Sequence, residues 1–339
     1  MRKRLLATLL ALGSLAMPAA ASAEDQEDAE PGWTAPRTQW GDPDLRGKWP
    51  IDIVGQTPRE RPKHFGTRAE LTDEEYEAAF TEAQRQLDRY QEEDKANLMG
   101  MGHWAERGYP LRQTSLIMEP ADGRYPPMTE EGARLAAQQK SSWTETVFDW
   151  VDDLSVWDRC ITRGMPGSML PGAYNGGIEI FQAPGILAIS LEMIHDTRVV
   201  YLDGRPAPPP GVTSWLGFSR GRWEGETLVI ETTNITPGGH IGNVGDSPRP
   251  VPNSTAMKVT ERLTPTGSDN IHYEAWIEDP VVLTAPFKLD FPWTRNEDYG
   301  MFEYACHEGN ISVRDYILAT GTQFAEARAK RARELAEAE

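Results

Sequence analysis

Apolar and polar side chains alternate along the chain between Gly177 and about His307, and this period of two predicts β-strands. Turn pairs such as Asp203-Gly204 and Glu224-Gly225 separate the alternating runs. Strands are expected at 178–180, 186–191, 197–202, 215–223, 227–233, 257–263, 271–277, 281–291 and 301–306. Short strands joined by short turns indicate an antiparallel meander, which either closes as a barrel or folds as a sandwich.

A period of 3.6 residues replaces this alternation nearer the N-terminus. Thr72 with Glu75 three residues later forms a capping box, which predicts a helix that begins there. Its apolar face comprises Tyr76, Ala79, Phe80, Ala83, Leu87 and Tyr90. A shorter helix is expected from Thr129 to about Gln139, and a short first strand at Ile51 and Ile53. The helices are expected to pack against the β core.

The first 23 residues have the pattern of a secretory signal peptide. Basic residues at 2–4 precede a short apolar run, and an Ala-Ser-Ala cleavage site ends at Ala23. The expected organisation is a signal peptide (1–23), an acidic Pro/Gly-rich tail (24–44), a helix-bearing region (45–170), an antiparallel β core (171–320) and a charged C-terminal helix (321–339). This pattern predicts a periplasmic or secreted protein.

Charge excludes one class of partner. The 339 residues carry 52 acidic and 34 basic side chains, and loss of the three basic residues in 1–23 takes the net charge from −18 to −21. Such an acidic chain lacks the excess of Lys and Arg that nucleic-acid binding needs. No later stretch approaches the roughly 18 apolar residues of a membrane span. The sequence does not indicate an oligomeric state.

Two cysteines, Cys160 and Cys306, are present. An even pair in an exported protein predicts a disulfide. Two buried free thiols, or one reactive nucleophile, are the alternatives.

Several blocks of sequence resemble a family of secreted bacterial proteins of unassigned function. The blocks are residues 43–49 (PDLRGKW), 120–127 (PADGRYPP), 158–166 (DRCITRGMP), 192–198 (EMIHDTR), 202–206 (LDGRP), 221–229 (GRWEGETLV) and 304–310 (YACHEGN). The resemblance spans Asp42 to Gly321, and it implies export and a lipocalin-like β fold but no catalytic assignment. Ala207 stands where the family pattern has His, which weakens any scheme with a base or metal there.

Familiar catalytic and cofactor motifs are missing from the sequence. The six histidines form no HExxH and no Cys/His set with zinc spacing, and no GxSxG, P-loop or GxGxxG is present. The sequence therefore predicts neither a cofactor nor a metal.

The densest polar cluster runs from Glu192 to Arg198. His195 is a candidate acid or base, with Asp196 or Glu192 to orient it and Arg198 to hold an oxyanion. In a regular strand Glu192, Asp196 and Arg198 share one face, and a bend at His195 would break that rule. The alternative is a Glu–Arg pair and a His at a strand end.

A second cluster lies around Cys306. Tyr304 is a candidate hydrogen-bond donor and His307 a candidate base. A disulfide to Cys160 would bring Arg163 near His307, where it suits an anionic or carbonyl oxygen. The alternative is a core strand held by the disulfide, with Arg163 in a surface ion pair.

Eleven tryptophans suit an aromatic-walled pocket, although most are expected in the core. His103 and Trp104 follow two Met-Gly pairs and are candidates for a lid over the pocket. Together these features predict an enzyme without a cofactor, a lyase, isomerase or hydrolase, that acts by acid–base chemistry on a hydrophobic or aromatic small molecule. The alternatives are a carrier of the same fold without catalysis, and a structural or surface-interaction protein.

Overall fold

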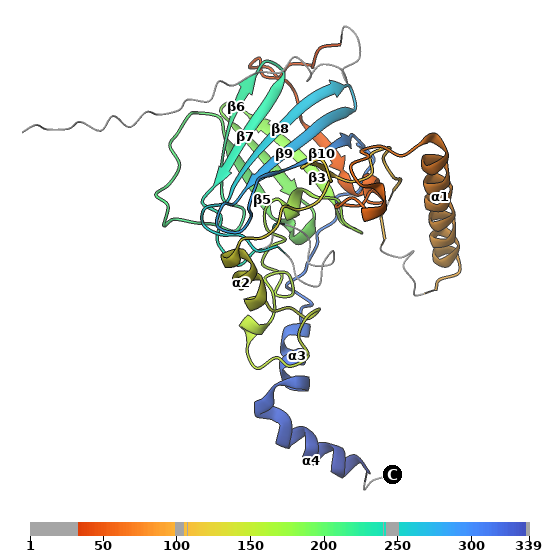
Figure 1. The fold of residues 1–339 in the computed structure, drawn as a ribbon, viewed down its shortest axis with the longest axis vertical. Helices are drawn as coiled ribbons and strands as arrows, with labels where there is room; N and C mark the ends of the chain where they lie inside the picture. The colour runs from red at the N-terminus through yellow and green to blue at the C-terminus, as the bar shows by residue number, and fades with distance from the viewer. Residues whose placement is uncertain (1–32, 99–104, 107, 240, 242–250, 337–339) are drawn as a thin grey trace, which may run out of the picture.

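The computed structural model describes residues 33–98, 105–106, 108–239, 241 and 251–336. Within them, ten strands form one curled sheet with helices around it (Figure 1). The strands are β1 (Gly47–Pro50), β2 (Ile117–Glu119), β3 (Gly177–Ala183), β4 (Ile186–Leu191), β5 (Thr197–Tyr201), β6 (Phe218–Glu224), β7 (Thr227–Thr233), β8 (Lys258–Gly267), β9 (Asn270–Glu278) and β10 (Phe287–Thr294). The helices are α1 (Asp73–Lys95), α2 (Glu130–Gln138), α3 (Ser312–Thr320) and α4 (Ala325–Ala336), with 3-10 turns η1 (Ile51–Val54), η2 (Lys63–Phe65), η4 (Val151–Asp153), η5 (Gly167–Met169), η6 (Met193–His195) and η8 (Thr322–Phe324).

The sheet follows the order β1-β3-β4-β5-β6-β7-β8-β9-β10-β2. It curls until β1 meets the end of β10, where the Asn296 N–H donates to the Lys48 carbonyl at 3.0 Å. The Arg295 guanidinium also lies 4.8 Å from the ring centroid of Trp49. The predicted mainly β, barrel-like fold is therefore confirmed. The expected all-antiparallel pairing is wrong at one place, because β5 and β6 are parallel.

Alternate residues of the long strands fill the interior of the sheet. In β9 and β10 the buried apolar and aromatic positions are Ile271, Tyr273, Ala275, Ile277, Phe287, Leu289, Phe291 and Trp293. This is the period of two that a strand with one buried face requires.

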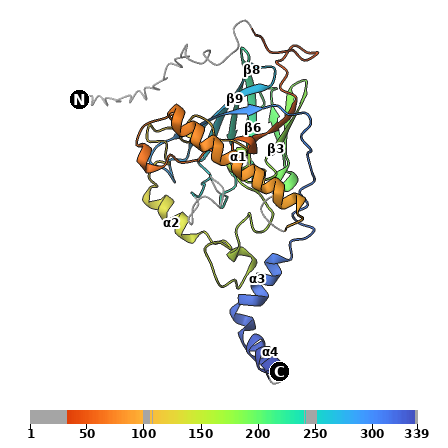
Figure 2. The same ribbon diagram turned by 90° about the vertical axis from the view of Figure 1, so that its right-hand side faces the viewer.

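The helices form as their patterns predict. Thr72 and Glu75 make both hydrogen bonds of the capping box at the start of α1, and Thr129 caps α2. Phe80 of α1 stacks on Tyr109 with the ring centroids 4.6 Å apart. Figure 2 shows α1 running across one side of the sheet.

Three predicted strands differ from the structure. β1 ends at Pro50, and the predicted strand at Ile51 and Ile53 is instead the turn η1. β10 starts at Phe287 rather than at Val281. The segment 301–306 forms no strand, because the Phe302 N–H donates to the side chain of Glu192 and not to a neighbouring strand.

None of the helices in the described part is long and apolar enough to cross a membrane. The predicted signal peptide (1–23) and residues 24–32 of the acidic tail (24–44) lie outside the described residues. α3 lies inside the range predicted as β core, and Figure 1 shows α3 and α4 extending away from the sheet.

A buried ion pair crosses the inner face of the sheet. Arg198 of β5 and Glu261 of β8 form a bidentate salt bridge, and both side chains are at most 2% exposed. Arg198 also donates to the hydroxyls of Ser219 (2.9 Å) and Thr232 (2.6 Å). Tyr273 donates to Glu261 at 2.9 Å. The ion pair therefore links five strands, and each charge has several partners.

Replacing Arg198 by Met should destabilise the protein by about 3–5 kcal/mol, because Glu261 would remain buried without its counter-charge. Urea unfolding measures this change. The double variant Arg198→Met with Glu261→Leu should recover most of the loss.

Arg220→Met provides the matched control on β6. Arg220 pairs with Glu231 at 3.6 Å on the half-exposed outer side, so its loss should cost less than about 1 kcal/mol. Equal losses for the Arg198 and Arg220 variants would contradict this assignment.

Candidate functional site

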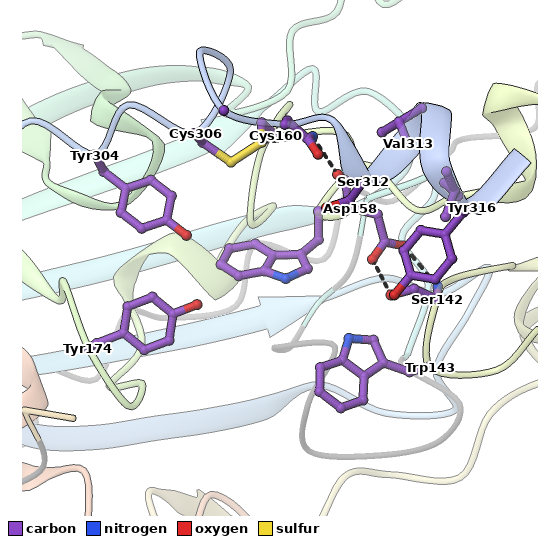
Figure 3. Close-up of a pocket in the computed structure, with 14 residues that line it drawn as sticks. Ser142, Trp143, Asp158, Cys160, Tyr174, Tyr304, Cys306, Ser312, Val313 and Tyr316 are labelled. Atoms are coloured by element: carbon purple, nitrogen blue, oxygen red, sulfur yellow. Dashed lines mark hydrogen bonds between the residues drawn. A yellow bond between two sulfur atoms is a disulfide. The ribbon is translucent and has the colours of Figure 1, made fainter. Parts of the chain in front are cut away.

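An aromatic pocket of about 380 Å³ lies where three distant chain segments meet. Its aromatic lining residues are Trp143, Trp157, Tyr174, Tyr304 and Tyr316. The disulfide between Cys160 and Cys306 joins two of the segments and forms part of the wall (Figure 3). The predicted cysteine pairing is therefore present in the structure.

Two tyrosines face each other in this aromatic pocket. The ring planes of Tyr174 and Tyr304 are inclined by 29°, with centroids 6.3 Å apart. Figure 3 shows both hydroxyl groups directed into the pocket. Burial, together with the neighbouring Tyr174 hydroxyl, raises the pKa of Tyr304. A tyrosine hydroxyl is protonated at neutral pH, so the Tyr304 hydroxyl is a hydrogen-bond donor, and it interacts with the neighbouring Tyr174 hydroxyl.

Asp158 holds the wall of the aromatic pocket in place. Its carboxylate accepts hydrogen bonds from the backbone N–H and hydroxyl groups of both Ser142 and Ser155, at 2.5–3.0 Å. Asn310 donates to the Asp158 backbone carbonyl at 2.8 Å. These contacts connect three segments, so the wall is defined before any ligand enters.

A layer of charged side chains lies beside the aromatic pocket at the start of β3. Three glycines make room for it. A Cβ atom on Gly176 would lie 2.2 Å from the Asp52 carboxylate, one on Gly177 2.5 Å from Glu192, and one on Gly172 2.8 Å from the Arg163 guanidinium. Larger residues in this segment would displace the charged side chains.

Glu192 connects this layer to the segment that carries Tyr304. Its carboxylate accepts hydrogen bonds from Asn175 (2.8 Å), the Tyr299 hydroxyl (2.7 Å) and the Phe302 N–H (3.2 Å). The prediction that Glu192 orients His195 is not supported by these contacts.

The Tyr299 hydroxyl also lies 3.0 Å from the carboxyl group of Glu106. A single hydroxyl proton cannot serve two carboxylates at once. Burial raises the pKa of Glu106.

His195 lies on an unusual stretch of backbone. Ile194 and His195 both have positive φ values, 64° and 41°, and such strain at non-glycine residues is concentrated at functional sites. The exposed imidazole Nδ1 lies 2.8 Å from the Tyr304 carbonyl oxygen. The two clusters predicted from the sequence therefore meet, but through a backbone group. Asp196 instead accepts from the Thr197 N–H, and burial raises its pKa.

The other predicted residues are spread over different places. Arg163 is 8% exposed, with its guanidinium 5.3 Å from the Trp157 ring centroid at the side of the aromatic pocket. His307 is exposed. Arg198 lies in the interior ion pair, which favours a structural role over the predicted substrate contact. His103 and Trp104 lie outside the described residues.

One group of possible metal ligands occurs among the described residues, on the outer side of β9 and β10. His272, Glu274 and Asp290 lie close enough to share an ion. The ammonium group of Lys288 contacts both Glu274 and Asp290. This lysine supplies the positive charge that a bound cation would bring.

Sequence reasoning missed Tyr174, Asp52, Glu106 and Tyr299. The glycine-rich segment 172–177 carried a signal, because three glycines around Tyr174 and Asn175 indicate close backbone approach to other groups. The remaining three residues stand in unremarkable local patterns.

No family model, curated protein or solved structure matches this chain. The resemblance to the secreted bacterial family stays a prediction.

Replacing Asp52 by Asn should change how stability depends on pH. Burial raises the pKa of Asp52, so the stability that this group contributes is present below about pH 4 and is lost as the pH rises through the folded-state pKa. The variant should gain stability relative to the wild type between about pH 4 and pH 7. Urea unfolding at both pH values tests this, and a pH-independent difference would contradict it.

Proposed function

We propose that this protein is exported and binds a small aromatic molecule that carries an oxygen acceptor, such as a phenol, a carbonyl compound or a carboxylate. The aromatic pocket supports this proposal, and its paired tyrosines carry the argument. Planar rings fit between aromatic walls, and the protonated Tyr304 hydroxyl is a donor for the oxygen.

The electrostatics favour a ligand with negative charge near its polar end. Arg163 is buried beside Trp157. Burial raises the pKa of Tyr304, and the positive charge of Arg163 acts in the opposite direction and lowers it. An anionic or polarised oxygen beside the Tyr304 hydroxyl would feel the same attraction. Export is supported by the disulfide, which persists in oxidising compartments.

Binding can be tested with naphthalene-2-carboxylate, 2-naphthol and naphthalene, followed by quenching of tryptophan fluorescence. The first two ligands should bind at least tenfold more tightly than naphthalene, because only they offer an oxygen to Tyr304. Tyr304→Phe should weaken their binding by about 5–10-fold and leave naphthalene unaffected.

Trp143 and Trp150 form a matched pair for the same measurement. Both are largely exposed, at 70% and 66%, but only Trp143 is among the pocket-lining residues. Trp143→Ala should weaken binding by about 2–10-fold, and Trp150→Ala should not. Equal effects of the two variants would place the ligand elsewhere.

We propose acid–base catalysis by His195 as a second candidate function, favoured by its strained backbone and its bond to the Tyr304 carbonyl. A histidine that donates from Nδ1 to a carbonyl presents Nε2 as a base. On an aromatic ketone, that base would remove a proton next to the carbonyl carbon while Tyr304 donates a hydrogen bond to the oxygen.

Exchange of the α-protons of 2-tetralone in D₂O, followed by NMR, tests this second candidate. His195→Gln should reduce the exchange rate by about 10²–10⁴-fold without changing ligand affinity, and His307→Gln is the control. If the α-protons exchange no faster with the protein than in buffer alone, the protein is a carrier without this catalytic activity. Absence of any ligand binding would favour a structural or surface-interaction protein.

A further inference from the structure

The aromatic pocket has aromatic side chains at two separate ends. Figure 3 shows Tyr174 and Tyr304 on one side of the pocket, which we call the tyrosine end. Trp143 and Tyr316 of α3 lie on the other side, which we call the α3 end. A ligand that contacts both ends must therefore extend across the pocket.

Contacts on both sides of the α3 end hold its backbone in place. Tyr316 packs against Phe148 with the ring centroids 5.1 Å apart, and the Phe148 N–H donates to the Thr320 hydroxyl at 3.0 Å. Ser142, the residue before Trp143, donates to the Asp158 carboxylate from its N–H and its hydroxyl.

The two aromatic side chains of the α3 end nevertheless remain accessible. Trp143 is 70% exposed and Tyr316 is 38% exposed. An aromatic ring of a ligand that covered them would remove this apolar surface from water, which favours binding.

The aromatic pocket is also larger than a single ring requires. An apolar cavity of about 150 Å³ accommodates benzene, whereas this pocket measures about 380 Å³. A ligand with one ring at the tyrosine end would leave the α3 end uncovered. Two rings, one at each end, use the available volume.

The charges of the pocket differ between its ends. The positive charge of Arg163 acts on Tyr304 at the tyrosine end. Figure 3 shows Asp158 beside Ser142, toward the α3 end. The Asp158 carboxylate already accepts four hydrogen bonds, from Ser142 and Ser155, and these match its roughly four acceptor sites. An anionic oxygen is therefore favoured near Tyr304 and disfavoured near Asp158.

We propose that the ligand of the aromatic pocket is an elongated compound with two aryl rings and an acidic or carbonyl oxygen at one terminus. The oxygen accepts from Tyr304, and the second ring packs against Trp143 and Tyr316. This inference rests on the function proposed for the pocket, and it adds the number of rings and their direction.

Biphenyl-4-carboxylate, biphenyl-2-carboxylate and benzoate test the number of rings, and calorimetric titration of the full chain measures their affinities. The 4-isomer should bind at least tenfold more tightly than benzoate, because its second ring reaches the α3 end. The 2-isomer has the same atoms, but its second ring lies beside the carboxylate, so it should gain less than threefold over benzoate.

The outcomes separate this inference from the proposed function. If the 4-isomer binds no more tightly than benzoate or the 2-isomer, the two-ring inference is wrong and the proposed function stands. If none of the three carboxylates binds saturably, both are wrong.

Tyr316→Ala tests the position of the second ring. It should weaken binding of the 4-isomer at least fivefold and leave benzoate binding unchanged, which also shows that the pocket is intact. Leu318→Ala is the matched control on α3, since Leu318 is 45% exposed and is not among the pocket-lining residues. Equal losses in the two variants would contradict the assignment.

Two conservative variants test the direction of the ligand. Tyr304→Phe should weaken binding of the 4-isomer by about 5–10-fold, because it removes the donor. Tyr316→Phe keeps the ring and should leave binding unchanged. The opposite result would place the carboxylate at the α3 end and overturn the proposal.

Discussion

The buried ion pair between Arg198 and Glu261 reinforces one of the two shortest strand pairings of the sheet. β5 and β6 are parallel and pair through only Val200–Ser219 and Tyr201–Arg220. Arg198 reaches over this junction to Ser219, Thr232 and Glu261 on the next three strands. Low dielectric inside the sheet strengthens these bonds and makes any loss of a partner costly. Five of the ten strands are therefore connected through this one cluster.

The charged layer at the start of β3 connects the sheet to the aromatic pocket. The sheet positions Gly177 and Leu191, and Glu192 follows directly with its carboxylate bonded to Asn175 and Phe302. Tyr174 is the residue before Asn175, and Tyr304 is two residues after Phe302. The buried carboxylate of Glu192 therefore holds both tyrosine-bearing segments in a fixed position relative to the sheet. A pocket built this way is preorganised, which lowers the entropic cost of binding.

Alternation in the sequence predicted most of the strands because burial of one face imposes a period of two. The same alternation places the side chain of Arg198 inside, because Arg198 is in phase with the buried Val200. Alternation could not identify Glu261 as the partner, since it specifies a face and not a neighbour across the sheet. It also misassigned 301–306, where a buried side chain and not a strand satisfies the backbone. Tyr304 was predicted as a donor, but its neighbour Tyr174 depends on long-range packing that no local pattern records.

Segment 154–160 lies between the aromatic pocket and a second cavity of about 430 Å³ beside α2, and it determines whether ligands in the two cavities can influence each other. Asp158 accepts four hydrogen bonds there, and the disulfide anchors the same segment at Cys160. A ligand in one cavity could alter the other only by moving this segment, which would break several charge-assisted bonds at once. Coupling between sites requires an element with two arrangements of similar free energy, and the hydrogen bonds of Asp158 and the disulfide act against a second arrangement of this wall. The geometry therefore favours two cavities that fill independently.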